Sequence, residues 1–310
     1  DLNNEYDNWK DILIQILKVF KRAFCILILT PNKIYAIKDS YGVRPLSIGK
    51  NNDSIAFSSE SISFTNLNFY KEINEGEIYV IDDNLHLNLI YKHSPNIKSV
   101  CSFEQIYFMN ENSVINGNIV KNKRELLGRK LALKDTFTNN YIVSGIPNTG
   151  NSYAKEYCKL LGLVYNQFID KRSNLGRTFI LQNDELRNIA CTQKYIYDKD
   201  VIKNNKLILV DDSLVRGTTI KNIIIKLKEL GANEVHVRVG SPMVTSICYY
   251  GIDIPTFTEL IANTKNLDEI CNNIGADSLK FLETEDMIDV LGEGHCTGCF
   301  NKDYKDKIEW

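Results

Sequence analysis

The residues with the clearest chemistry are two adjacent carboxylates, Asp211 and Asp212, at the end of an apolar run. Residues 207–210 are continuously apolar, which is typical of a strand buried on both faces of a parallel sheet. Ligands of such sheets bind beyond the carboxyl ends of the strands. Paired carboxylates at this place suit hydrogen bonds from ribose hydroxyls or a Mg²⁺ ion. The sequence therefore predicts a ligand site at residues 211 and 212.

A loop that leads into a helix follows the acidic pair, and its residues are Ser213, Leu214, Val215, Arg216, Gly217, Thr218 and Thr219. We expect the helix over 220–230, with Thr218 or Thr219 as its N-cap and Gly231 after its end. A helix N-terminus offers free N–H groups and partial positive charge, which suit a 5'-phosphate. Gly217 lets the backbone approach that phosphate closely. The alternative is that Asp-Asp-Ser only ends a strand and starts a turn.

A pair of cysteines forms a second candidate site. Cys296 and Cys299 form a CxxC motif, which needs further ligands before it is specific for a metal. Eight cysteines in a chain of 310 residues with 44% hydrophobic residues do not indicate a disulfide scaffold, and a reduced intracellular compartment is favoured. Of the other six cysteines, those at positions 25, 158, 191 and 271 fit ordinary core thiols.

The bulk composition restricts the function classes. A formal net charge of −2 gives no electrostatic footprint for nucleic acid, so local groups must hold any bound phosphate. The apolar stretch at 12–20 is interrupted by Gln15 and Lys18 and is shorter than the roughly 20 residues of a membrane span. We therefore expect an amphipathic helix there and no membrane partner.

Two organisational patterns divide the chain near residue 98. Up to about residue 93 short β-like runs alternate with turns, at 25–30, 33–38, 55–58, 77–81 and 85–91. After about residue 99 helices alternate with strands: helices at 121–138 and 152–161, and strands at 141–143, 163–169 and 234–239. This alternation predicts an α/β fold with a parallel sheet flanked by helices. We expect a β-rich domain over 1–98 and a second domain over 99–310.

The run 207–219 resembles the phosphoribosyl pyrophosphate signature of type I phosphoribosyltransferases. The segments 101–108, 176–180, 249–255, 259–262 and 274–279 resemble blocks of the glutamine phosphoribosylpyrophosphate amidotransferase family. The resemblance runs from about residue 20 to about residue 304. It implies displacement of pyrophosphate from C1 of phosphoribosyl pyrophosphate by ammonia, which gives 5-phosphoribosylamine in the first step of purine synthesis.

The resemblance also implies roles for basic and loop residues. It makes Pro147, Asn148, Thr149 and Gly150 the pyrophosphate loop. Thr149 would face Mg²⁺ together with Asp211 and Asp212. Basic side chains would close over the leaving group, namely Lys171, Arg172 and Arg177 of a mobile loop and Lys194 beyond it. Ordinary surface charges are the alternative for these residues.

Family members that carry a 4Fe-4S cluster use cysteines that match Cys101, Cys248, Cys296 and Cys299. The resemblance therefore implies an iron–sulfur cluster held by these thiolates. Structural zinc takes the same number of ligands, so the residues alone leave zinc and empty thiols open.

Segments 36–46 and 57–61 resemble the later part of the family's N-terminal glutaminase domain of the Ntn-hydrolase type. Relatives use an N-terminal cysteine as nucleophile, whereas Asp1 stands at the start here. We expect ammonia-dependent activity and no glutaminase activity from this chain. The family implies phosphoribosyl pyrophosphate and ammonia or glutamine as partners and a homotetramer. A cytoplasmic location is expected, with a plastid or another organelle left open. The alternatives are a non-catalytic regulator that binds phosphoribosyl pyrophosphate and a degenerate partner subunit.

Overall fold

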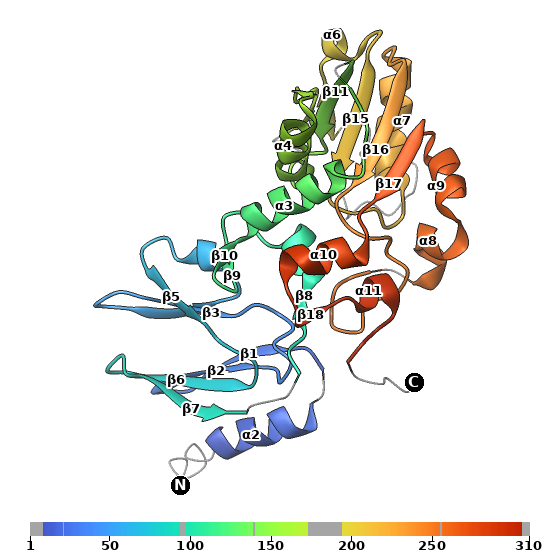
Figure 1. The fold of residues 1–310 in the computed structure, drawn as a ribbon. Helices are drawn as coiled ribbons and strands as arrows, with labels where there is room; N and C mark the ends of the chain where they lie inside the picture. Colours follow the sequence, from blue (N-terminus) through green and yellow to red (C-terminus); the bar gives the residue numbers. More distant parts are fainter. Residues whose placement is uncertain are drawn as a thin grey trace.

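The computed structural model describes residues 9–20, 22–93, 97–138, 140–172, 194–254 and 256–305. The β-rich part comes first, and a parallel sheet flanked by helices follows (Figure 1). Within these residues no helix is both long and apolar enough to cross a membrane.

Two antiparallel sheets pack against each other in the β-rich part. One has the order β1-β2-β6-β7 and the other the order β4-β3-β5. Helix α2 (Trp9–Val19) covers the outer face of the first sheet through Leu13 and Leu17. The strands are β1 (Cys25–Leu29), β2 (Lys33–Lys38), β3 (Ser47–Lys50), β4 (Ile55–Ser58), β5 (Asn68–Glu72), β6 (Glu77–Asp82) and β7 (Leu87–Lys92), with a short turn of helix at Ser61–Ser63.

Five parallel strands form the second sheet in the order β12-β11-β15-β16-β17. They are β11 (Tyr141–Gly145), β12 (Val164–Tyr165), β15 (Lys206–Asp211), β16 (Glu234–Val239) and β17 (Ser278–Phe281). Helices α3 (Val120–Ala132) and α4 (Gly150–Leu161) cover one face, whereas α7 (Thr218–Glu229) and α9 (Leu267–Ile274) cover the other (Figure 1). The predicted α/β class with a helix-flanked parallel sheet is confirmed.

Alternate residues of β15 face the two helical layers. Ile208 and Val210 pack in the core with α3 and α4, whereas Leu207 and Leu209 pack in the core with α7 and α9. All four side chains are fully buried, as a central parallel strand requires. The acidic pair therefore follows a rigid element at its carboxyl end.

The remaining elements connect or close the two parts. They are β8 (Val100–Cys101), a π-helical turn (Glu104–Phe108), the hairpin β9 (Val114–Ile115) and β10 (Asn118–Ile119), the ribbon β13 (Ile169–Lys171) and β14 (Tyr195–Tyr197), α6 (Lys199–Ile202), a short helical turn (Phe257–Glu259), α8 (Ile261–Thr264), α10 (Thr284–Leu291), β18 (His295–Cys296) and α11 (Gly298–Asn301). Strand β18 pairs in parallel with β8, so the C-terminal segment returns to the start of the second part.

Four expectations about the elements were wrong. The helix expected over 121–138 ends at Ala132, and residues 133–138 form no helix. The strand expected over 163–169 divides into the two short strands β12 and β13. Strands β3 and β5 were not anticipated. The N-cap of α7 is Gly217 and not Thr218 or Thr219. The helix begins directly after Gly217, whose left-handed φ of 78° ends the loop.

Candidate functional site

The acidic pair lies where β15 ends. Asp211 is the last residue of the strand, and Asp212 begins the loop with only 5% of its surface exposed. The Ser213 hydroxyl donates to Asp212 Oδ1 at 2.6 Å, and the Asp212 N–H donates to Asp211 Oδ1 at 3.0 Å. Both carboxylates are therefore oriented by the backbone and by the first residue of the loop.

Burial makes this pair electrostatically unusual. Desolvation raises the pKa of Asp212 to about 6, against hydrogen bonds from Ser213 and Thr149 and the charge of Arg124. Desolvation and the neighbouring Asp212 also raise the pKa of Asp211 well above its ordinary value, and the charge of Lys194 opposes this rise. Two buried carboxylates with raised pKa values favour a ligand that brings positive charge or hydrogen-bond donors.

The loop from Ser213 to Gly217 is built to receive an anion. Among the described residues, no backbone N–H group of this loop donates to another part of the chain. Helix α7 begins at the next residue, so its partial positive charge points at the same place. Glycine suits position 217 because its φ is left-handed, and a Cβ there would lie 2.9 Å from Cδ1 at the flexible end of the Ile261 side chain.

The predicted pyrophosphate loop lies beside the acidic pair. Gly145 is the register partner of Val210, and the Ile146 N–H donates to the Val210 carbonyl at 2.8 Å. The peptide bond between Pro147 and Asn148 is cis. Thr149 reaches Asp212 with its side chain, and a Cβ on Gly150 would overlap the carbonyl oxygen of Val210. The structure thus brings Thr149, Asp211 and Asp212 together.

The structure describes three of the four predicted basic residues. Lys194 lies within electrostatic reach of Asp211. Its carbonyl accepts a hydrogen bond from the Arg172 N–H at 3.0 Å, at the end of the ribbon of β13 and β14. Lys171 and Arg172 are exposed there. Arg177 lies outside the described residues.

Three residues that sequence reasoning did not assign also surround the acidic pair. Tyr107 lies in the π-helical turn, and its pKa is raised by burial and by both Asp212 and Asp211. Arg124 in α3 is only 3% exposed and bonds to backbone carbonyls of that turn and the residue after it. Tyr153 in α4 is fully buried and donates to the Ile106 carbonyl at 3.1 Å. The pattern of α3 held a signal, because Arg124 shares an apolar helical face with residues 120, 127 and 131.

The four predicted cluster cysteines come from three separate segments of the chain and meet near the junction of the two parts. Cys101 and Cys296 are register partners in β8 and β18, and Cys299 follows in α11. All three are under 10% exposed, and Cys248 is half-buried against the same core. Beyond burial, the thiols at 101, 248 and 296 each raise the pKa of Cys299, so the four groups lie within electrostatic reach of one another.

This thiol cluster fits a metal group chemically. The Cys248 sulfur accepts the N–H groups of Tyr250 and Ile252 at 3.3 and 3.4 Å, which would stabilise a thiolate. No group of three or more His, Cys, Asp or Glu side chains in the described ranges is arranged around one metal ion. His295 is partly buried, and its Nδ1 lies 2.8 Å from the Gly292 carbonyl oxygen.

Cys25 is a poor nucleophile in this structure. It begins β1, and its thiol donates to the Arg44 and Pro45 carbonyls at 3.5 and 3.7 Å. Burial raises the pKa of this thiol to about 12, so the reactive thiolate is scarce at neutral pH.

No protein-family model matches the chain, but similar proteins are found by sequence. The amidophosphoribosyltransferase of Bacillus subtilis is 35% identical over 308 residues, which cover 96% of this chain and 64% of that protein. Those of Drosophila melanogaster and Methanocaldococcus jannaschii are 32% and 34% identical, and the chain covers 62% and 66% of them. The chain thus spans a little under two thirds of the length of these curated relatives.

Solved structures agree with the sequence matches. The glutamine phosphoribosylpyrophosphate amidotransferase of B. subtilis, complexed with ADP and GMP, superposes with a TM-score of 0.84 and 32% identity, over 95% of this chain and 70% of that one. A structure described as the allosteric regulatory enzyme of purine biosynthesis gives a TM-score of 0.85 and 32% identity, over 96% and 69%. Identity above 30% over more than two thirds of a solved relative shows that the chain belongs to the amidophosphoribosyltransferase family.

Proposed function

We propose that this chain displaces pyrophosphate from phosphoribosyl pyrophosphate with ammonia and forms 5-phosphoribosylamine, the first step of purine synthesis. One observation carries the proposal. The acidic pair, the anion-receiving loop before α7 and the loop before α4 meet at the carboxyl end of β15 and β11. This arrangement matches a ligand that carries a phosphate, a ribose and a pyrophosphate.

Each part of the ligand has a matching part of the site. The loop from Ser213 to Gly217, with Thr218 and Thr219 at the start of α7, would hold the 5'-phosphate. Asp211 and Asp212 would accept hydrogen bonds from the ribose hydroxyls. The pyrophosphate would lie at residues 147–150, near Lys194.

The reaction needs positioning more than proton transfer. The nitrogen lone pair of ammonia forms a bond to C1, the bond from C1 to the pyrophosphate oxygen breaks, and one proton leaves the resulting ammonium group to water. Mg²⁺ would be held by Asp211, Asp212 and Thr149 and would neutralise charge on the leaving pyrophosphate. Lys171, Arg172, Arg177 and Lys194 are proposed to stabilise the same charge.

Pyrophosphate release tests the reaction. Purified protein with Mg²⁺, phosphoribosyl pyrophosphate and ammonium should release pyrophosphate, and Asp212→Asn should reduce the rate by about 10²-fold or more. Asp200→Asn is the matched control, because this exposed carboxylate lies in α6, which precedes the opposite end of β15. Equal rates in wild type and Asp212→Asn would refute the assignment of the site.

The same assay separates the alternative functions. A non-catalytic regulator or a degenerate partner subunit would bind phosphoribosyl pyrophosphate without releasing pyrophosphate in the presence of ammonium. Binding is measured by calorimetry with and without Mg²⁺. Tight binding together with no release would support these alternatives over the enzyme.

We further propose that Cys101, Cys248, Cys296 and Cys299 hold a 4Fe-4S cluster, with zinc as the alternative. Support comes from four thiols of three separate segments that lie within electrostatic reach of one another. Anaerobically purified protein should contain iron and sulfide and show charge-transfer absorption, and Cys296→Ser should lose both. Cys158→Ser is the control, because this thiol is equally buried and lies outside the set. Zinc without iron would select the alternative.

The wider organisation is also proposed from the family. The partition at residues 98 and 99, a homotetramer and a cytoplasmic location belong to this reading, and one relative in Arabidopsis thaliana is described as chloroplastic. In the isolated chain of 310 residues ammonia, and not glutamine, is the proposed nitrogen donor, because the thiol of Cys25 is buried and protonated.

A further inference from the structure

Arg124 is a buried cation that has no carboxylate within ion-pairing distance among the described residues. It is 3% exposed, and its Nε and Nη2 atoms donate to the carbonyls of Gln105 and Met109 at 2.8 and 2.7 Å. Burying a charge is costly unless the charge is paired or hydrogen-bonded. The partners of Arg124 are backbone carbonyls, so its role is sought in the segment that carries them.

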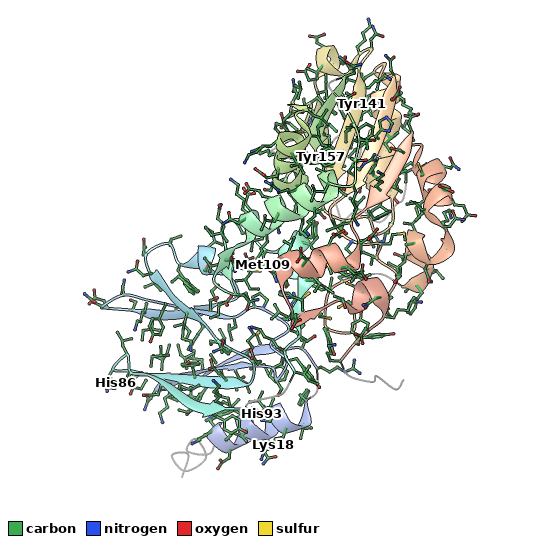
Figure 2. The ribbon with its side chains drawn as sticks, in the orientation of Figure 1. Lys18, His86, His93, Met109, Tyr141 and Tyr157 are labelled. Carbon is green, nitrogen blue, oxygen red and sulfur yellow. The ribbon has the colours of Figure 1, made fainter. Side chains whose placement is uncertain are left out.

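That segment is the π-helical turn Glu104–Phe108, which lies between the two parts of the molecule. A π-helical turn is rare and often marks a functional site. Met109, directly after the turn, lies at the junction of the β-rich part and the parallel sheet (Figure 2). Three hydrogen bonds hold this backbone. Tyr153 donates to the Ile106 carbonyl, which lies in sequence between the two carbonyls that Arg124 binds.

The turn carries Tyr107, which is 46% exposed and lies within electrostatic reach of Asp212 and Asp211. Arg124 of α3 and Tyr153 of α4 bind backbone carbonyls on both sides of Tyr107 in the sequence. These bonds fix the backbone of Tyr107 and therefore restrict the position of its side chain. Helix α4 begins at the predicted pyrophosphate loop, and a Cβ on Gly128 of α3 would overlap the Tyr153 backbone. The two helices and the turn therefore form one packed unit.

We propose that Arg124 is a positioning residue of the phosphoribosyl site, which fixes the π-helical turn and thereby holds Tyr107 beside Asp211 and Asp212. In this proposal Arg124 acts through the turn and not through contact with the substrate. Its planar guanidinium reaches two carbonyls four residues apart, which a lysine ammonium cannot do with the same geometry. The catalytic consequence rests on the proposed function, whereas the structural consequence does not.

The test uses Arg124→Lys, which keeps the buried charge, with Arg238→Lys as the matched control. Arg238 is also a buried arginine, 2% exposed, but its guanidinium pairs with Asp135 instead of the turn. Tyr107 is replaced by 3-fluorotyrosine, and its ¹⁹F chemical shift is measured with and without Asp212→Asn. We expect Asp212→Asn to move the shift in the wild-type and Arg238→Lys backgrounds and to have little effect in Arg124→Lys. An unchanged response in folded Arg124→Lys protein overturns the proposal, whatever the activity.

A double-mutant cycle then tests the catalytic consequence. Arg124→Lys should lower kcat/KM for ammonium-dependent pyrophosphate release by roughly 10- to 10²-fold, as expected for a small misplacement of a site group. Combined with Tyr107→Phe it should lower kcat/KM little further, whereas the effects of Arg238→Lys and Tyr107→Phe should multiply. Multiplying effects for Arg124 and Tyr107 would overturn the positioning role. A wild type that releases no pyrophosphate but shows the expected ¹⁹F response would refute the proposed function and leave the positioning intact.

Discussion

Asp212 meets two opposing demands. Its burial raises its pKa to about 6, yet a carboxylate that accepts ribose hydroxyls or faces Mg²⁺ must be ionised. Ser213 and Thr149 donate hydrogen bonds to it and partly offset the cost. We therefore expect the ionised Asp212 to destabilise the folded protein when no ligand is bound, and a bound cation or ribose to remove this cost.

This cost should appear in the pH dependence of stability. Because the folded-state pKa lies above the ordinary 3.8, Asp212 lowers the free energy of unfolding as pH rises from about 3.8 to about 6. Metal-free Asp212→Asn should lose less stability over this range than wild type, measured by urea denaturation. Mg²⁺ should stabilise wild type more than the variant at pH 7. A steeper loss in the variant would contradict the pKa direction.

Gly150 allows the loop before α4 to approach β15. A Cβ there would overlap the Val210 carbonyl oxygen, so Gly150→Ala must displace the loop at a cost of about 1–3 kcal/mol. We expect binding of phosphoribosyl pyrophosphate, followed by calorimetry, to weaken at least tenfold.

Gly162→Ala provides the control for this substitution at the other end of the same helix. Gly162 has a left-handed φ of 67° but open space around its Cβ position, so alanine strains the backbone without moving the loop. It should lower thermal stability and leave the ligand affinity within about twofold of wild type. Equal weakening in both variants would show that α4 stability, and not close approach, governs binding.

At the scale of elements, the anion-receiving loop is held by the segment that precedes α8. The Ile261 N–H donates to the Val215 carbonyl at 3.0 Å, and Arg216 forms an ion pair with Glu259 at 2.7 Å. Both charged side chains are about half exposed, so the pair contributes at most about 1 kcal/mol to stability. Its larger effect is to neutralise a cation next to the phosphate site.

Glu259→Gln should therefore free the charge of Arg216. We expect affinity for phosphoribosyl pyrophosphate to rise about two- to fivefold at low ionic strength, and the gain to disappear at 0.5 M salt because screening removes it. Calorimetry at both salt concentrations measures this. Weaker binding of the variant at low salt would instead show that the pair orders the loop.

Sequence patterns predicted the elements whose signals are local. The apolar run of β15, the glycine of its loop and the end of α4 at Gly162 were visible because each follows from a short stretch of chain. The end of α3 was missed because its expected C-terminal turn carries no glycine or proline. The roles of Arg124 and Tyr107 were missed because they depend on contacts between α3, α4 and the π-helical turn. Contacts between distant segments leave no periodic signal.

At the scale of the whole molecule, the two ends of the second part meet at the β-rich part. Strand β18 pairs with β8, and the Cys101 N–H donates to the Val43 carbonyl at 3.0 Å. Glu60 of the β-rich part also accepts the Asn110 N–H at 2.7 Å, just beyond the π-helical turn. The cysteine cluster and the turn beside the acidic pair therefore share one junction.

The nitrogen source is a prediction at this scale. Ammonium should support pyrophosphate release by the 310-residue chain, whereas glutamine should not, because the buried Cys25 thiol is protonated at neutral pH. Cys25→Ser should leave the ammonium-dependent rate within about twofold of wild type. Glutamate release that disappears in Cys25→Ser would show instead that this thiol acts as a nucleophile.

Formation of the bond between C1 and nitrogen tests the proposed reaction most directly. Phosphoribosyl pyrophosphate labelled with ¹³C at C1 is mixed with ¹⁵N-ammonium, Mg²⁺ and the protein, and the ¹³C signal is followed continuously by NMR. A C1 signal split by one-bond coupling to ¹⁵N, absent with Asp212→Asn, is the predicted result. An unchanged substrate signal, or a C1 signal of ribose 5-phosphate without ¹⁵N coupling, would contradict it.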